Sequence, residues 1–173
     1  MVLPTAYWGP ASYFRLRLGE AETEVMETFE KQTFRNRCLI RDAKGEPVRL
    51  TVPVKNVEHK QLTRDIEISY QSRWQHQHWI TLVSAYEHTP YFFYYADFFR
   101  PLYEKQTRWL VDLNEAISSL IVMLMKNMPE GASEAPRTTD WSGVTWTDKH
   151  RWQKEESIAG LLFEYGPETI SKI

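Results

Sequence analysis

Apolar and polar residues alternate with a period of two over much of the first 70 positions, which is typical of half-buried strands. The stretches with this pattern are residues 2–7, 24–29, 38–41, 48–54 and 65–69. Between the third and fourth, Asp42-Ala43-Lys44-Gly45 predicts a β-hairpin turn, because its glycine can adopt a positive φ. A helix over residues 11–18 interrupts this pattern, and Gly19 is expected to end it.

From residue 72 onward, apolar residues recur with the spacing of an α-helix. Ser72 and Gln75 have the spacing of a capping box, which predicts the start of a helix over residues 72–88. Thr89-Pro90 then opens a short aromatic helix over residues 91–99. Pro101 would clash with a continuing helix, so we expect a third helix to begin there and end near residue 127.

The composition of the chain changes again in its C-terminal part. Residues 130–140 are linker-like, whereas residues 141–152 contain three tryptophans and are expected to pack back on the rest of the chain. Ser157 is expected to cap a last helix over residues 158–165, which Gly166-Pro167 closes. We therefore predict one domain over residues 1–173, in which residues 1–70 are mainly strands, residues 72–127 are helical and residues 141–173 dock.

The predicted fold class is α/β, with α+β as the alternative. An N-terminal mixed β-sheet with a β-hairpin is covered by three helices, and the C-terminal segment packs back on the domain. The composition supports a globular chain, because 42% of its residues are hydrophobic and 25% are charged. This excludes the disordered, collagen and coiled-coil classes.

Charge and cysteine content limit the classes of partner and the cellular compartment that the sequence predicts. Twenty-one basic against 23 acidic residues give a net charge of −2, so a nucleic-acid partner is not expected. Cys38 is the single cysteine and forms no internal disulfide, which suits a reducing compartment. The sequence has no apolar run near the roughly 20 residues that a bilayer requires, so the expectation is a cytoplasmic protein without a membrane span.

Lys31, Arg35, Asn36 and Arg37 form the sharpest polar cluster in the sequence. Three cations and an amide within seven residues, between two predicted strands, suit a carboxylate or phosphate ligand. The alternative is a solvated turn that balances the neighbouring acidic residues. We predict these four residues as ligand-binding candidates.

Tyr7 and Tyr13 lie on either side of Gly9-Pro10, at the end of the first predicted strand. Open α/β sheets bind ligands near strand ends, so both tyrosines are further candidates for a ligand pocket. The alternative is that they are core aromatics.

His78 is the candidate catalytic residue, as a general base. It lies one helical turn after Trp74, at the edge of a predicted packed face, and the alternative is a histidine with only a structural role. His76 points roughly 200° away on the same helix, so the two do not share a metal ion. We predict no metal site and no cofactor.

Several motifs together resemble the WbqC-like protein family. They are Leu3-Pro4-Thr5-Ala6-Tyr7, the segment from Lys31 to Arg37, Ser84-Ala85-Tyr86, Thr89-Pro90-Tyr91-Phe92 and Gly166-Pro167-Glu168. The resemblance implies a bacterial protein linked to surface-polysaccharide or amino-sugar metabolism, with transfer of glycine or a similar acyl group to a sugar. The element order is also similar to that of nucleotidyl transferases, but residues 1–20 lack the histidines of that chemistry.

The function that follows is a cytoplasmic acyl or aminoacyl transferase acting on a small anionic or amino-sugar-type metabolite. This hypothesis rests on the resemblance, because the sequence contains no catalytic triad, P-loop or metal set. The competing hypothesis is a non-catalytic ligand-binding or protein-interaction domain, which the many aromatic residues favour. The sequence makes no prediction of oligomeric state.

Overall fold

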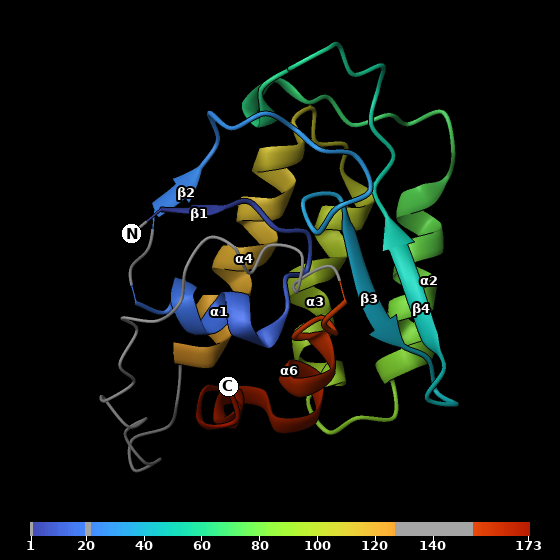
Figure 1. The fold of residues 1–173 in the computed structure, drawn as a ribbon. Coiled ribbons are helices and arrows are strands. Elements are labelled where there is room, and N and C mark those ends of the chain that lie inside the picture. The colour runs from blue at the N-terminus through green and yellow to red at the C-terminus, as the bar shows by residue number, and fades with distance from the viewer. Residues whose placement is uncertain (1, 20–21, 127–153) are drawn as a thin grey trace.

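The computed structural model describes residues 2–19, 22–126 and 154–173. It is a mixed α/β structure with small sheets and several helices (Figure 1). In chain order the elements are β1 (Val2–Pro4), α1 (Ala11–Arg17), β2 (Glu22–Glu24), β3 (Arg37–Arg41), β4 (Pro47–Thr51), the 3-10 helix η1 (Thr63–Asp65), α2 (Trp74–Tyr86), α3 (Phe92–Glu104), α4 (Leu110–Lys126), α6 (Ala159–Tyr165) and the 3-10 helix η3 (Gly166–Ser171).

The described strands form two separate sheets of two strands each. Strands β1 and β2 are parallel, with Leu3 opposite Thr23, and β3 and β4 form the antiparallel hairpin, with Leu39 opposite Arg49. Figure 1 shows the hairpin alongside α2, while β1 and β2 lie on the other side of the molecule near α4. The predicted fold class and hairpin are confirmed, with the strands divided between two sheets.

Local hydrogen bonds explain why the sequence alone predicts the hairpin. The Asp42 carboxylate accepts the backbone N–H groups of Lys44 at 2.9 Å and Glu46 at 2.8 Å. Gly45 has a φ of 83°, a conformation that is costly for residues with a Cβ. The turn is thus specified by its own residues.

Two of the predicted strands are wrong. Residues 25–29 bend at residues 26–27 and make only one bridge, between Thr28 and Leu62, because the segment opposite them turns into η1. The stretch predicted at 65–69 begins inside η1, and only Glu67 and Ile68 form isolated bridges, to Trp109 and Val54. Both stretches have too few paired residues to form a β-ladder.

The helix boundaries around Pro101 also differ from the prediction. Pro101 lies inside α3, which continues to Glu104, and the next helix begins only at Leu110. Proline in a helix interior removes one hydrogen bond and costs about 3 kcal/mol. The buried side chains of Phe99 and Tyr103, on either side of the proline, anchor both parts of the helix in the core.

The predicted capping box at the start of α2 does not form. Arg73 takes the N-cap position without a side-chain hydrogen bond. The Gln75 amide instead donates to the backbone carbonyl oxygens of Leu102 at 3.3 Å and Lys105 at 2.7 Å. Gln75 therefore ties α2 to the end of α3.

The described C-terminal residues pack back on the N-terminal half, as predicted. Ser157 donates its backbone N–H to the Leu39 carbonyl of β3 at 2.7 Å, and its hydroxyl accepts the Ala159 N–H at 3.1 Å to cap α6. Gly166 ends α6 with a φ of 55°, where an added Cβ would lie 2.5 Å from the Tyr91 ring. The linker and tryptophan-rich segments predicted at 130–140 and 141–152 lie outside the described residues.

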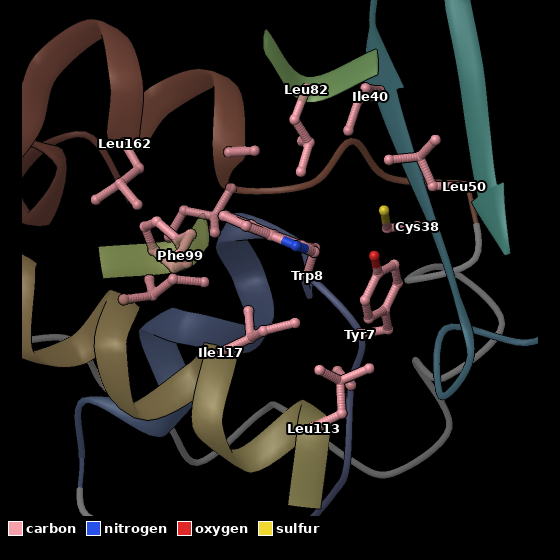
Figure 2. Packing of buried hydrophobic residues seen from close by; sticks show 14 of the residues in the cluster. Tyr7, Trp8, Cys38, Ile40, Leu50, Leu82, Phe99, Leu113, Ile117 and Leu162 are labelled. Atoms are coloured by element: carbon pink, nitrogen blue, oxygen red, sulfur yellow. The ribbon is translucent and has the colours of Figure 1, made fainter. Parts of the chain in front are cut away.

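The core is rich in aromatic side chains. Figure 2 shows Trp8 directed toward Phe99 of α3 and Tyr7 directed toward Cys38 of β3. Trp8 is fully buried with a φ of 46°, a left-handed conformation that costs of order 1–3 kcal/mol and persists only where packing imposes it. None of the helices in residues 2–19, 22–126 and 154–173 is long and apolar enough to cross a membrane.

Candidate functional site

Four buried side chains form a continuous hydrogen-bonded series, called here the buried polar chain: Trp8, Tyr103, Tyr7 and His78. The indole Nε1 of Trp8 lies 2.8 Å from the Tyr103 hydroxyl oxygen, and the two tyrosine hydroxyl oxygens lie 2.9 Å apart. The Tyr7 hydroxyl oxygen lies 2.8 Å from Nδ1 of His78. The chain thereby joins the end of β1 to α2 and α3.

Trp8 fixes the direction of the first bond, because its indole N–H can only donate to the Tyr103 hydroxyl. If Tyr103 donates to Tyr7 and Tyr7 donates to Nδ1 of His78, every donor in the chain has an acceptor. The imidazole is then neutral, with its proton on Nε2. A charged imidazole would reverse the bonds and leave the Tyr103 hydroxyl hydrogen without an acceptor within the chain.

The environment of His78 favours the neutral form for a second reason. Burial lowers the pKa of His78 from 6.5 to about 4, and a hydrogen bond to the backbone of Thr51 opposes this shift only in part. Burial likewise raises the pKa of Tyr7 and of Tyr103, so both phenols stay protonated. At neutral pH the chain carries no charge.

This geometry restricts what His78 can do chemically. A neutral imidazole is the correct form for a general base, but its Nδ1 already accepts from Tyr7 and only 6% of the residue is exposed. The Trp74 ring packs edge-on at 5.1 Å between ring centroids, as the helical spacing of the two residues suggested. The catalytic role of His78 stays a prediction.

Arg35 is held inside the protein. Its guanidinium makes a paired interaction with Glu27, from Nε at 2.6 Å and Nη2 at 2.7 Å, and Nη1 donates to Thr33 Oγ1 at 3.2 Å. Glu30 adds a second carboxylate at 3.7 Å, and only 1% of the Arg35 residue is exposed. These internal contacts engage the donors that a ligand would otherwise use.

Asn36 has similar surroundings, whereas Lys31 is exposed. The Asn36 side-chain amide donates to the Val52 carbonyl oxygen at 3.0 Å, and its backbone carbonyl accepts the Val52 N–H at 2.8 Å. These bonds connect the start of β3 to the residue that follows β4. Ligand contact at Lys31, Arg35 and Asn36 stays a prediction, and the structure does not bring the three side chains together.

Arg37 lies in a different position, on the wall of a hollow with a volume of about 250 Å³. Its Nε donates to Thr51 Oγ1 at 2.9 Å, which fixes the guanidinium across the hairpin. We call this site the basic hollow; its lining residues are Gln32, Thr33, Phe34, Arg37, Cys38, Leu39, Arg49 and Lys154. Three of these described residues are cationic, and none of them is a carboxylate.

Arg37 is the one cation of the basic hollow that the sequence predicted as a ligand-binding residue, whereas Arg49 and Lys154 were missed. Arg49 pairs directly with Leu39 across the hairpin, and Arg37 pairs with Thr51. Alternate residues of a strand share a face, so the hairpin register was a signal that could have grouped Arg49 with Arg37. Lys154 is brought in by the returning C-terminal segment, and no local sequence pattern groups it with the two arginines of the hairpin.

The remaining candidates lie apart from the hollow or inside the core. Tyr13 is buried, its hydroxyl bonds to Ser118 of α4, and burial raises its pKa to about 12. Tyr13 and Tyr7 thus contact different partners. Burial also raises the pKa of the Cys38 thiol. Within the described part of the chain, no group of three or more His, Cys, Asp or Glu residues is placed to hold a metal ion.

A protein-family model described as the WbqC-like protein family matches residues 24–131, well over half of the 173 residues. The chain belongs to the WbqC-like protein family. Neither a curated protein nor a solved structure matches the sequence of this WbqC-like protein. The resemblance seen in its motifs is therefore confirmed at the level of the family.

Both parts of the site in this WbqC-like protein combine residues from inside and outside the matched segment. In the basic hollow, Arg37 and Arg49 lie within residues 24–131 and Lys154 lies beyond them. In the buried polar chain, His78 lies within the segment and Tyr7 precedes it. The matched segment thus contributes the hairpin and the helices α2 and α3, and the remaining described residues complete the site.

Proposed function

We propose that this WbqC-like protein binds a small anionic metabolite in the basic hollow. Three cationic side chains around one concave site, with no carboxylate among its described lining residues, are the observation that carries the proposal. Such a site attracts anions and can form charge-assisted hydrogen bonds with them. The family resemblance implies the same class of ligand.

The finer proposal is that the protein is an acyl or aminoacyl transferase of the glycine type, acting on an amino-sugar-type acceptor in bacterial surface-polysaccharide or amino-sugar metabolism. In such a reaction the amine nitrogen bonds to the acyl carbon, the bond to the leaving group breaks, and the amine proton passes to a base. The basic hollow would hold the anionic part of a substrate. His78 can accept the proton only if Tyr7 releases its Nδ1.

The second candidate function is a non-catalytic ligand-binding or interaction protein in the same cytoplasmic setting. Nδ1 of His78 already has a hydrogen-bond partner and the Cys38 thiol is buried, so both groups are poorly placed to react with a bound molecule. These two observations favour the non-catalytic function. The basic hollow serves binding equally well under either function. The two functions differ in whether the bound substrate is converted to a product.

Isothermal titration calorimetry against nucleotide-sugars, acyl-CoAs and free amino acids tests the binding proposal. The key variant is Arg49→Gln, which removes an exposed cation of the hollow, and the control is Arg15→Gln, an exposed arginine of α1 outside it. We expect Arg49→Gln to weaken binding of an anionic ligand about tenfold or more, and Arg15→Gln to leave it unchanged. Equal effects of the two variants would refute the hollow as the site.

Mass spectrometry of the ligand mixture then separates the two functions. A transferase converts an acyl donor and an amino-sugar acceptor into an amide whose mass is the sum of the two minus the leaving group. Binding of an anionic ligand without any such product, across all donor and acceptor pairs, would favour the non-catalytic function.

A further inference from the structure

The charge of the basic hollow exceeds what a single carboxylate needs. Arg37, Arg49 and Lys154 contribute three positive charges, and the other lining residues that the structure describes are neutral. A carboxylate brings one negative charge, whereas a phosphate ester brings about 1.5 to 2 and three acceptor oxygens. The number of cations therefore fits a phosphate-bearing group better than an amino acid or a carboxylic acid.

The hairpin orients the arginines for this purpose. Arg37 and Arg49 stand on neighbouring antiparallel strands at alternate positions of the register, so they belong to one face of the hairpin. Nε of Arg37 is bonded to Thr51, and its two terminal nitrogens have no hydrogen-bond partner among residues 2–19, 22–126 and 154–173, so they form a fixed pair of donors there. Such a fork matches two oxygens of one phosphate group.

The size of the hollow is compatible with a group larger than a carboxylate. A carboxylate group has three non-hydrogen atoms and would leave most of a volume of about 250 Å³ to solvent. A diphosphate has nine non-hydrogen atoms and would occupy more of it.

We propose that the basic hollow is a phosphate site and that the anionic group it takes is a phosphate ester or, best, a diphosphate. This inference rests on the proposed function, because it names the ligand class of that same site. The shared chemistry is the phosphate group, which a sugar phosphate, a nucleoside diphosphate, a phosphate-bearing acyl thioester or free phosphate can supply. The neutral lining residue Gln32 is exposed and can provide a further polar contact.

Calorimetric titration of the full chain at low ionic strength tests the assignment, with inorganic phosphate, pyrophosphate, acetate and glycine as probes. We expect pyrophosphate to bind about tenfold or more tightly than acetate, and phosphate to lie between them. Arg49→Gln should weaken pyrophosphate binding about tenfold or more, and Arg15→Gln should not change it. Arg37→Lys, which keeps the charge but loses the fork, should also weaken pyrophosphate binding.

The outcomes separate this inference from the proposed function. Acetate binding as tight as pyrophosphate, with both weakened by Arg49→Gln, would overturn the phosphate assignment and leave the anion site intact. If no anion binds, or if Arg49→Gln does not change the binding, both the phosphate assignment and the anion site of the proposed function are refuted. Uridine diphosphate, glucose 1-phosphate and coenzyme A then compete against pyrophosphate, and tighter binding of one of them identifies the source of the phosphate.

Discussion

The Tyr7 hydroxyl oxygen lies 2.8 Å from Nδ1 of His78, so a residue just after β1 and a residue in the middle of α2 share one buried hydrogen bond. Because the same hydroxyl also lies 2.9 Å from that of Tyr103, Tyr7 is the central member of the buried polar chain. The bond orients the ring of His78, and burial lowers the pKa of His78 so that the ring is neutral at neutral pH. The bond also makes the stability of the core depend on one phenolic hydroxyl.

Tyr7→Phe should lower the free energy of unfolding by about 1–3 kcal/mol, because it leaves Nδ1 of His78 and the Tyr103 hydroxyl without their buried partner. Denaturant unfolding at neutral pH measures the change. Tyr94→Phe is the matched control, since Tyr94 is 68% exposed, and should have little effect. Equal stability of Tyr7→Phe and the parent would contradict the buried polar chain.

Stability should fall as the pH drops from 6.5 toward about 4. In this window the unfolded chain protonates His78 at its usual pKa of 6.5, whereas the folded chain keeps it neutral because its pKa is lowered to about 4. The unfolded state thus binds more protons, and the stabilisation that is complete above pH 6.5 is lost progressively, by roughly 3 kcal/mol. Urea unfolding at pH 7 and pH 4.5 measures the difference.

His78→Gln provides the control for this pH dependence. The variant cannot titrate in the window, so its free energy of unfolding should change less between pH 7 and pH 4.5 than that of the parent. An unchanged difference in the variant would assign the acid sensitivity to other groups. Retention of any transferase activity by the same variant would remove His78 as the general base.

Arg35→Ala should lower the free energy of unfolding by about 3 kcal/mol or more, because Glu27 and Thr33 lose a partner that is itself almost completely buried. The comparison is Arg64→Ala, which breaks an exposed contact with Asp65 and should cost less than about 1 kcal/mol. Thermal and denaturant unfolding of both variants give the two values. If Arg35 instead serves a ligand, its replacement should weaken binding and leave unfolding unchanged.

Cys38 should resist alkylation in the folded protein. Its thiol is buried in the core, and burial raises its pKa, so little thiolate is available to react. Iodoacetamide at pH 8, followed by mass spectrometry, should modify the chain fully in denaturant and only slowly without it. Native alkylation at the rate of a free thiol would show that the thiol is accessible, for example from the basic hollow.

The sequence by itself determined those elements whose bonds are local. The hairpin turn is specified by the carboxylate of Asp42 and by Gly45, and α6 is capped by the hydroxyl of Ser157, two residues before Ala159. The helical periodicity likewise placed His78 one turn from Trp74. In each case the interacting groups are close in the chain, so their spacing predicts the contact.

Only the tertiary structure decided which polar residues are internal and which face a ligand. Lys31 to Arg37 looked like one basic cluster, yet Arg35 is neutralised by Glu27 inside the protein, while Arg37 turns to the basic hollow with Arg49 and Lys154. Packing also kept α3 helical through Pro101. The reason is that burial, desolvation and long-range partners set these outcomes, and they arise only when distant segments come together in the fold.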